Sequence, residues 1–160
     1  MLSFKDHVPL DEFVFKTYLF CPQMTSNAFG DIKEPVRYAK TWMQYALMRD
    51  VQVLRVLVNA RSRSLLLNTP VISQHLRTLE LKTVFLDGSS TDLSGCPALE
   101  DLKDIFKKDM QLSPIFSKLK TLVLDWWVVA SKVRAVIHFL RKAPVLEKIS
   151  IRLCEVYMCL

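Results

Sequence analysis

Leucine and isoleucine recur along this chain in a short frame, in which the first, fourth and sixth positions of a hexamer are apolar. A clear copy is Leu119-Lys-Thr-Leu122-Val-Leu124. Positions four and six cannot share a helix face, because they lie about 200° apart around a helix axis. In a strand they point to the same side, and the first leucine lies where the chain enters the strand. Each copy therefore predicts a short strand with one buried face.

The frame occurs five times, in VQVLRV (51–56), LRTLEL (76–81), LEDLKD (99–104), LKTLVL (119–124) and LEKISI (146–151). The copies begin 25, 23, 20 and 27 residues apart, and one of them has Asp104 at the third apolar position. Such spacing is typical of leucine-rich repeats, whose unit is a strand plus a helical or irregular return. We therefore predict an α/β fold, a short leucine-rich-repeat solenoid with parallel concave strands and convex helices.

Two amphipathic helices are predicted directly in front of strands, because apolar residues follow one another at spacings of three and four. The first helix covers RYAKTWMQYALMRD, with a stripe made of Tyr38, Trp42, Tyr45 or Ala46, and Arg49. The second covers 131–144, with a stripe made of Val133, Val136 or Ile137, and Leu140. Ser131 is a suitable N-cap for the second helix, and Pro144 ends it.

The chain divides into two parts. Residues 1–37 form an N-terminal lead-in or capping segment, in which the alternation of Phe13, Phe15 and Thr17 predicts a first, atypical strand. Residues 38–160 form the repeat array of about five repeats. The array is irregular at 104–118, where a polar stretch has no clean helical period.

Bulk properties indicate a folded protein without a membrane span. Of the 160 residues, 51% are hydrophobic and 24% are charged, which argues against disorder. Apolar runs such as WWVVA reach only about five residues, and the N-terminus has no apolar signal region. We expect a cytoplasmic or nuclear location. The cysteines Cys21, Cys96, Cys154 and Cys159 are then expected to be reduced thiols.

The net charge of +6 raises the alternative of a basic nucleic-acid-associated protein without enzymatic activity. Its basic residues are scattered, however, in pairs such as Lys107-Lys108 and Arg141-Lys142. Nucleic-acid-binding proteins concentrate positive charge on one face or along one helix. The distribution favours a solvated surface, so we expect neither nucleic acid nor a membrane as a partner.

Catalytic motifs are not apparent. The three glycines, Gly30, Gly88 and Gly95, do not allow a phosphate-binding or dinucleotide-binding loop to be written. The histidines His7, His75 and His138 stand without a Cys, Asp or Glu at ligand spacing. The pair Cys154 and Cys159 has no second pair that would complete a tetrahedral metal site. We expect no enzyme, no catalytic residue, no metal and no cofactor.

A short solenoid offers a binding surface in place of a catalytic cleft. Residues between the inward leucines project from the strands onto the concave face. The predicted protein-binding residues are Arg55, Thr78, Glu80, Lys82, Asp101, Lys103, Thr121, Asp125, Lys148 and Arg152. Val123 and Ser150 occupy the same kind of position. Mixed charges with interspersed threonines suit another protein and suit a polyanion poorly.

Several longer phrases carry a resemblance to a known family. They are VPLDEF (8–13), WMQYALMRDVQVLRV (42–56), LSGCPALEDLK (93–103) and APVLEK (143–148). In these phrases, and over nearly its whole length, the chain resembles the plant F-box and leucine-rich-repeat proteins, especially those of grasses. The resemblance implies an intracellular solenoid that recruits a target protein, whose identity it does not give. In complete members an F-box helix bundle also docks on the Skp-type adaptor of a cullin ubiquitin ligase.

Two departures from the family lead to further expectations. The F-box would lie before Val8, and several more repeats would lie between the CPALEDLK and FSKLKTL phrases. The chain is therefore expected to be a truncated form that does not bind a Skp-type adaptor directly. After Leu153 it runs CEVYMCL, with Glu155 as its one charge. An apolar, uncapped end predicts self-association through residues 146–160.

Overall fold

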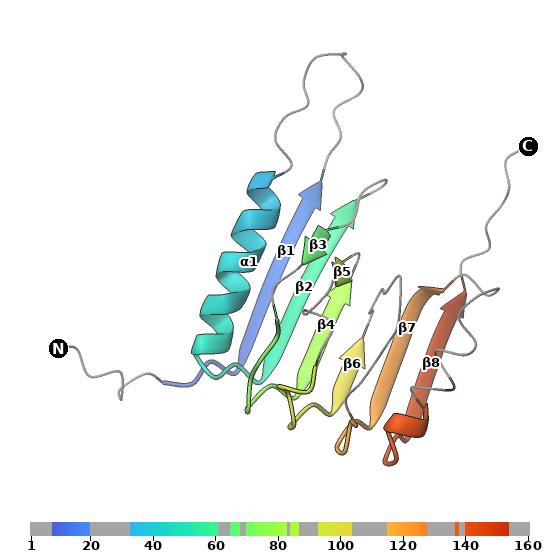
Figure 1. Cartoon of the computed structure of the whole chain (residues 1–160). Coiled ribbons are helices and arrows are strands. Elements are labelled where there is room, and N and C mark those ends of the chain that lie inside the picture. Colours follow the sequence, from blue (N-terminus) through green and yellow to red (C-terminus); the bar gives the residue numbers. More distant parts are fainter. Residues whose placement is uncertain are drawn as a thin grey trace, which may run out of the picture.

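A computed structural model describes residues 8–19, 33–60, 65–67, 70–82, 84–86, 93–103, 115–127, 137 and 140–153. The fold is α/β, and its main feature is a six-stranded sheet of order β1-β2-β4-β6-β7-β8 (Figure 1). These strands are β1 (Glu12–Leu19), β2 (Val53–Ala60), β4 (Thr78–Lys82), β6 (Asp101–Lys103), β7 (Thr121–Trp127) and β8 (Lys148–Leu153). Neighbouring strands pair in parallel throughout this order. The helix α1 (Lys33–Met48) and a two-stranded parallel sheet of β3 (Leu65–Leu67) and β5 (Val84–Leu86) accompany it.

The five predicted hexamers provide five consecutive strands of this sheet, in register. Leu54 pairs with Leu79, Leu79 with Leu102, Leu102 with Leu122, and Leu122 with Ile149. The four leucines are 0% exposed, which confirms that the fourth position of the frame points to one buried side. The strand predicted around Phe13 and Phe15 is confirmed as β1, at the edge of the sheet beside β2.

The turn that enters each strand is built in the same way in successive units. The carbonyl oxygen of Gln52 accepts hydrogen bonds from the N–H groups of Arg77 and Thr78, at 2.8 and 3.0 Å. The carbonyls at the equivalent position are those of Arg77, Glu100 and Lys120. Each of them also accepts two N–H groups from the start of the next strand, at 2.8–3.0 Å. The hexamer is therefore a repeated structural unit, and each unit satisfies backbone donors of the following one.

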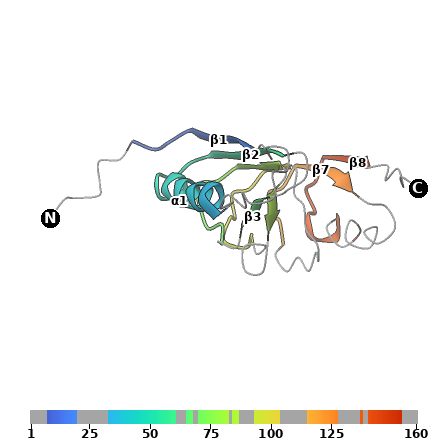
Figure 2. The same ribbon diagram turned by 90° about the horizontal axis from the view of Figure 1, so that it is seen from above.

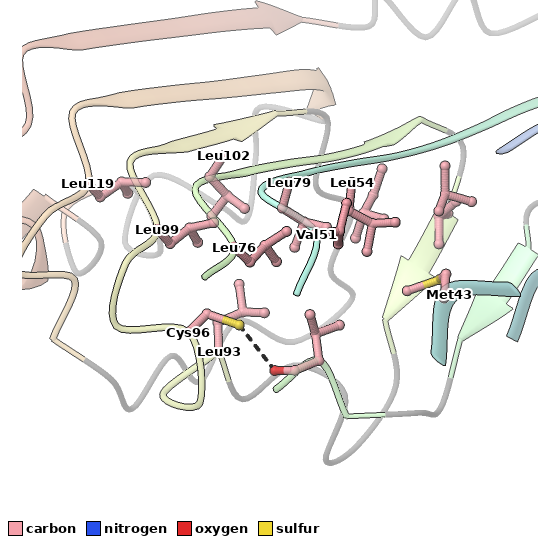
Figure 3. Close-up of a cluster of buried hydrophobic side chains, with 14 of the residues drawn as sticks. Met43, Val51, Leu54, Leu76, Leu79, Leu93, Cys96, Leu99, Leu102 and Leu119 are labelled. Carbon is pink, nitrogen blue, oxygen red and sulfur yellow. Dashed lines mark hydrogen bonds between the residues drawn. The ribbon is translucent and has the colours of Figure 1, made fainter. Parts of the chain in front are cut away.

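A further buried position lies three residues before the first leucine of the unit, where the sequence pattern gave no signal. It is occupied by Ser73, Cys96, Phe116 and Ala143, which are 3–7% exposed. The Oγ atom of Ser73 accepts the N–H groups of His75 and Leu76, both at 3.2 Å. The thiol of Cys96 donates to the carbonyl oxygen of Val71 at 3.3 Å, as Figure 3 shows. These side chains share a location but no chemical property that a pattern could reveal.

The helix predicted after residue 36 is confirmed as α1, and Ala46, the predicted alternative to Tyr45, is buried, but the aromatic residues of the predicted stripe are not. Tyr38, Trp42 and Tyr45 are 55%, 49% and 51% exposed. The buried side of α1 consists of Ala39, Met43 and Ala46, at 0%, 3% and 0% exposure. Both sets have helical spacing and differ by about one residue, so periodicity alone cannot choose between them. Two alanines allow close approach to the core, whereas the three aromatic rings would need more room.

The end of α1 is a tight turn that leads the chain to β2. Asp50 has a left-handed backbone, with a φ of 56°. Its N–H donates to the carbonyl of Leu47 at 3.2 Å, and the N–H of Val51 donates to the carbonyl of Ala46 at 3.4 Å. These bonds form a Schellman motif, which usually places glycine where Asp50 stands. Ala46 and Val51 are both 0% exposed, so they also supply the apolar contact of that motif.

The last unit differs from the others in burial. Ile149 and Ile151 follow the frame and pair with Leu122 and Leu124, yet they are 39% and 40% exposed. The prediction that this copy also has a buried face is therefore wrong for its two isoleucines. The physical reason is position, because β8 is the edge strand of the sheet and has a paired strand on one side only.

Some predictions concern parts of the chain that are described incompletely. Of the second predicted helix, residues 137 and 140–142 are described and are helical, with Ile137 and Leu140 exposed. Val133, Val136, Asp104 and most of the irregular stretch lie outside the described residues. The predicted division between residues 37 and 38 falls within α1, and β1 belongs to the same sheet as the array. In the described part of the chain, no helix has the length and apolarity that crossing a lipid bilayer requires.

Candidate functional site

The six-stranded sheet has two different faces. Figure 2 shows α1 and β3 on one side of it, where the leucines of the frame are buried. Residues at the alternate positions point to the other side, because successive side chains of a strand face opposite ways. We call this side the open face. On the described strands from β2 to β8, its residues include Arg55, Leu57, Thr78, Glu80, Lys82, Asp101, Lys103, Thr121, Val123, Lys148, Ser150 and Arg152.

The open face contains a hollow of about 550 Å³. Its lining consists of Leu57, Glu80, Lys82, Asp101, Lys103, Thr121, Val123, Lys148 and Arg152. Seven of these residues are among the ten predicted from the sequence. The structure therefore brings together side chains that are up to 95 positions apart, from Leu57 to Arg152. The prediction missed Leu57, because an apolar residue in an apolar strand carries no signal that distinguishes it from core.

The other three predicted residues lie beside the hollow or outside the description. Arg55 and Thr78 occupy open-face positions on β2 and β4. Asp125 belongs to β7, but its side chain lies outside the described residues. The sequence thus indicated which strand positions face away from the core, and the parallel register decided which of them meet.

The acidic side chains of the open face have partners on the same face. The Nε atom of Arg55 lies 3.2 Å from a carboxylate oxygen of Glu12 and 3.5 Å from one of Glu80. The hydroxyl of Thr78 donates to a carboxylate oxygen of Asp101 at 3.3 Å. Arg55 and Glu12 are 40% and 48% exposed, so water screens their attraction and the pair contributes little to stability. These contacts place Arg55 beside both glutamates and Thr78 beside Asp101.

The arrangement gives no sign of reaction chemistry. Among the described residues, no group of three His, Cys, Asp or Glu side chains could hold a metal ion. Cys96 is a free thiol, and burial raises its pKa, although a backbone hydrogen bond from Ser73 opposes that rise. A buried, protonated thiol is a poor nucleophile. The described hollow is a surface lined by side chains of both charge signs and by Leu57 and Val123.

Comparison with known proteins adds no family assignment. No protein-family model matches the chain, and neither the curated proteins nor the solved structures contain a match.

Proposed function

We propose that the chain is a short leucine-rich-repeat array that binds another protein through the open face. The observation that carries the proposal is the hollow, which collects charged and apolar side chains from β2, β4, β6, β7 and β8 on a face that the described elements do not cover. Repeat arrays use such extended faces as interaction surfaces. The repeated double hydrogen bond at the strand entrances supports the repeat interpretation.

The resemblance to plant F-box and leucine-rich-repeat proteins suggests a more specific role. In that role the open face recognises the protein that a cullin-type ubiquitin ligase modifies, inside the cell. The array itself would perform no reaction, because target recognition needs only a complementary surface. The lining contains residues of both charge signs and the apolar residues Leu57 and Val123. It therefore suits a polypeptide that carries both polar and apolar side chains.

The experiment is site-specific photocrosslinking in an extract of plant cells. A photoreactive phenylalanine derivative replaces Val123 in the hollow, and in a second protein it replaces Lys118, an exposed residue that does not line the hollow. We expect a specific protein to be crosslinked from position 123 and not from position 118. Ubiquitinated forms of that protein in the same sample would support the ligase role. Equal crosslinking from both positions would contradict recognition by the open face.

A further inference from the structure

The strand register arranges the open face in three rows that cross the sheet. The row at the amino ends of the strands contains Glu12, Val53, Thr78, Asp101, Thr121 and Lys148. The middle row contains Val14, Arg55, Glu80, Lys103, Val123 and Ser150. The row at the carboxyl ends contains Lys16, Leu57 and Lys82, and Arg152 lies at the same end of β8. The amino-end row therefore has two acidic residues and one basic residue, the middle row has one acidic and two basic residues, and the charged residues named at the carboxyl ends are all basic.

The two charge signs differ in how they are compensated. Glu12 and Glu80 both lie close to Arg55, and Asp101 accepts a hydrogen bond from Thr78. In contrast, Lys82, Lys103 and Lys148 form no ion pair with any carboxylate in the described part of the chain. The hollow has four cationic and two acidic lining residues, which gives it a net charge of +2. The positive charge that no carboxylate pairs with in the described part of the chain is that of Lys82, Lys103 and Lys148.

We infer that the partner places an acidic, extended segment in this hollow, with its carboxylates near Lys82, Lys103 and Lys148. The inference rests on the proposed function and names the chemistry of the partner. The hollow reaches from Leu57 on β2 to Arg152 on β8, across four gaps between strands. At about 4.8 Å for each gap, that distance is about 19 Å. An extended peptide at about 3.3 Å per residue crosses it with about six residues.

The lining also indicates how such a segment is composed. Val123 lies between Lys103 on β6 and Ser150 on β8, and Leu57 lies at the far end of the hollow. An apolar side chain among the acidic ones can contact Val123 and remove apolar surface from water. Successive side chains of an extended segment face opposite ways, so only every second residue of the segment faces the hollow. Among the residues that face it, acidic side chains alternating with aliphatic ones fit the lining better than acidic side chains alone.

A nucleic acid fits the same face less well. Its phosphates form an uninterrupted line of negative charge, and proteins bind it with correspondingly uninterrupted positive surfaces. In the hollow, Glu80 and Asp101 interrupt the cationic residues and would repel a phosphate. The amino-end row would repel it as well, because that row contains Glu12 in addition to Asp101.

The test uses defined probes and fluorescence anisotropy with the whole chain. The first probe is a fluorescein-labelled octapeptide with the sequence Glu-Glu-Val-Val-Glu-Glu-Val-Val, in which glutamate and valine alternate on each side of the extended chain. A second peptide has lysine in place of each glutamate, and an oligothymidylate of eight nucleotides is the third probe. We expect the glutamate peptide to bind with one-to-one stoichiometry and to weaken as salt is added. The lysine peptide should not bind, and the oligonucleotide should bind more weakly than the glutamate peptide.

Two triple variants with the same net charge make the test specific to the face. The first carries Lys82→Met, Lys103→Met and Lys148→Met, which keep the length of the aliphatic stem and remove the charge. The control carries Lys118→Met, Lys120→Met and Arg141→Met, three exposed residues that do not line the hollow. Loss of one exposed charge pair corresponds to about 1.4-fold to fivefold in affinity, so the first variant should bind about threefold to 100-fold more weakly. The control should bind within about twofold of the unmodified chain, and circular dichroism confirms that both variants fold.

Each contrary result overturns the inference in a recognisable way. Equal weakening by both triple variants shows attraction to net charge rather than to the hollow. Tighter binding of the oligonucleotide, lost in the first variant alone, shows a nucleic-acid surface. Failure of the glutamate peptide to bind also contradicts an acidic partner, and the crosslinking from position 123 then separates two cases. A specific crosslinked protein leaves the proposed function standing, whereas its absence removes that function too.

Discussion

Leu122 and Ile149 occupy the same position of two neighbouring hexamers and pair directly in the sheet, yet replacing them by alanine should have different effects. Leu122 is 0% exposed and Ile149 is 39% exposed. Leu122→Ala removes three carbon atoms from a closed environment, a loss of about 2.4 kcal/mol at about 0.8 kcal/mol per group. The cavity left behind raises the total to roughly 3–4 kcal/mol of unfolding free energy.

Ile149→Ala removes the same number of carbon atoms from a partly exposed place. About three fifths of the transfer free energy is then lost, which is roughly 1.5 kcal/mol. Because the site is open to solvent, no closed cavity remains to add to that loss. A third variant, Thr121→Ala, changes an open-face residue next to Leu122 and should cost under about 0.5 kcal/mol.

Urea unfolding followed by circular dichroism measures all three variants against the unmodified chain. The slope of the unfolding free energy against urea concentration should be the same for all variants. An equal slope would show that they unfold from comparable native states. An Ile149→Ala effect as large as that of Leu122→Ala would refute the reasoning, since it would mean that β8 is covered as completely as β7. Equal sensitivity at Thr121 and Leu122 would refute the assignment of the two faces of the strand.

Three other predictions use different features of the structure. Asp50→Gly should raise the unfolding free energy by about 0.5–1 kcal/mol in thermal denaturation, because glycine adopts the left-handed backbone without a Cβ clash, whereas Asp50→Ala should lower it. The thiol of Cys96 should resist a thiol reagent until the protein is unfolded, because it is buried and its pKa is raised. Because of that raised pKa, the Cys96 thiol keeps its proton to a higher pH in the folded state than in the unfolded state. The stability difference between the unmodified chain and Cys96→Ala should therefore shrink as the pH rises above the ordinary pKa of 9.0 toward the folded-state value. The double variant Ile149→Lys and Ile151→Lys should self-associate less than the unmodified 160-residue chain in analytical sedimentation, because charge on the edge strand opposes pairing of two edges. Unchanged sedimentation would mean that the chains contact one another through a different surface.

The sequence by itself determined the strands of the repeated hexamers and which of their positions point away from the core. Positions four and six of the frame can lie on one side only in a strand, and four consecutive copies have a buried leucine at position four. The same alternation assigned Glu80, Lys103 and Thr121 to the opposite face, where the structure has them lining one hollow. Local geometry was sufficient for these predictions, because the direction of a side chain in a strand follows from its place in the chain.

Only the tertiary structure decided which apolar residues are covered. The helix α1 has two stripes of similar spacing, and its packing against the core selected Ala39 and Met43 over Trp42. Ile149 has the pattern of a core residue but is exposed, because its strand has a paired strand on one side only. Cys96 is buried at a position that no residue type marks. Burial depends on the number and size of neighbours, which come from distant parts of the chain, and a periodic pattern records only the direction in which a side chain points.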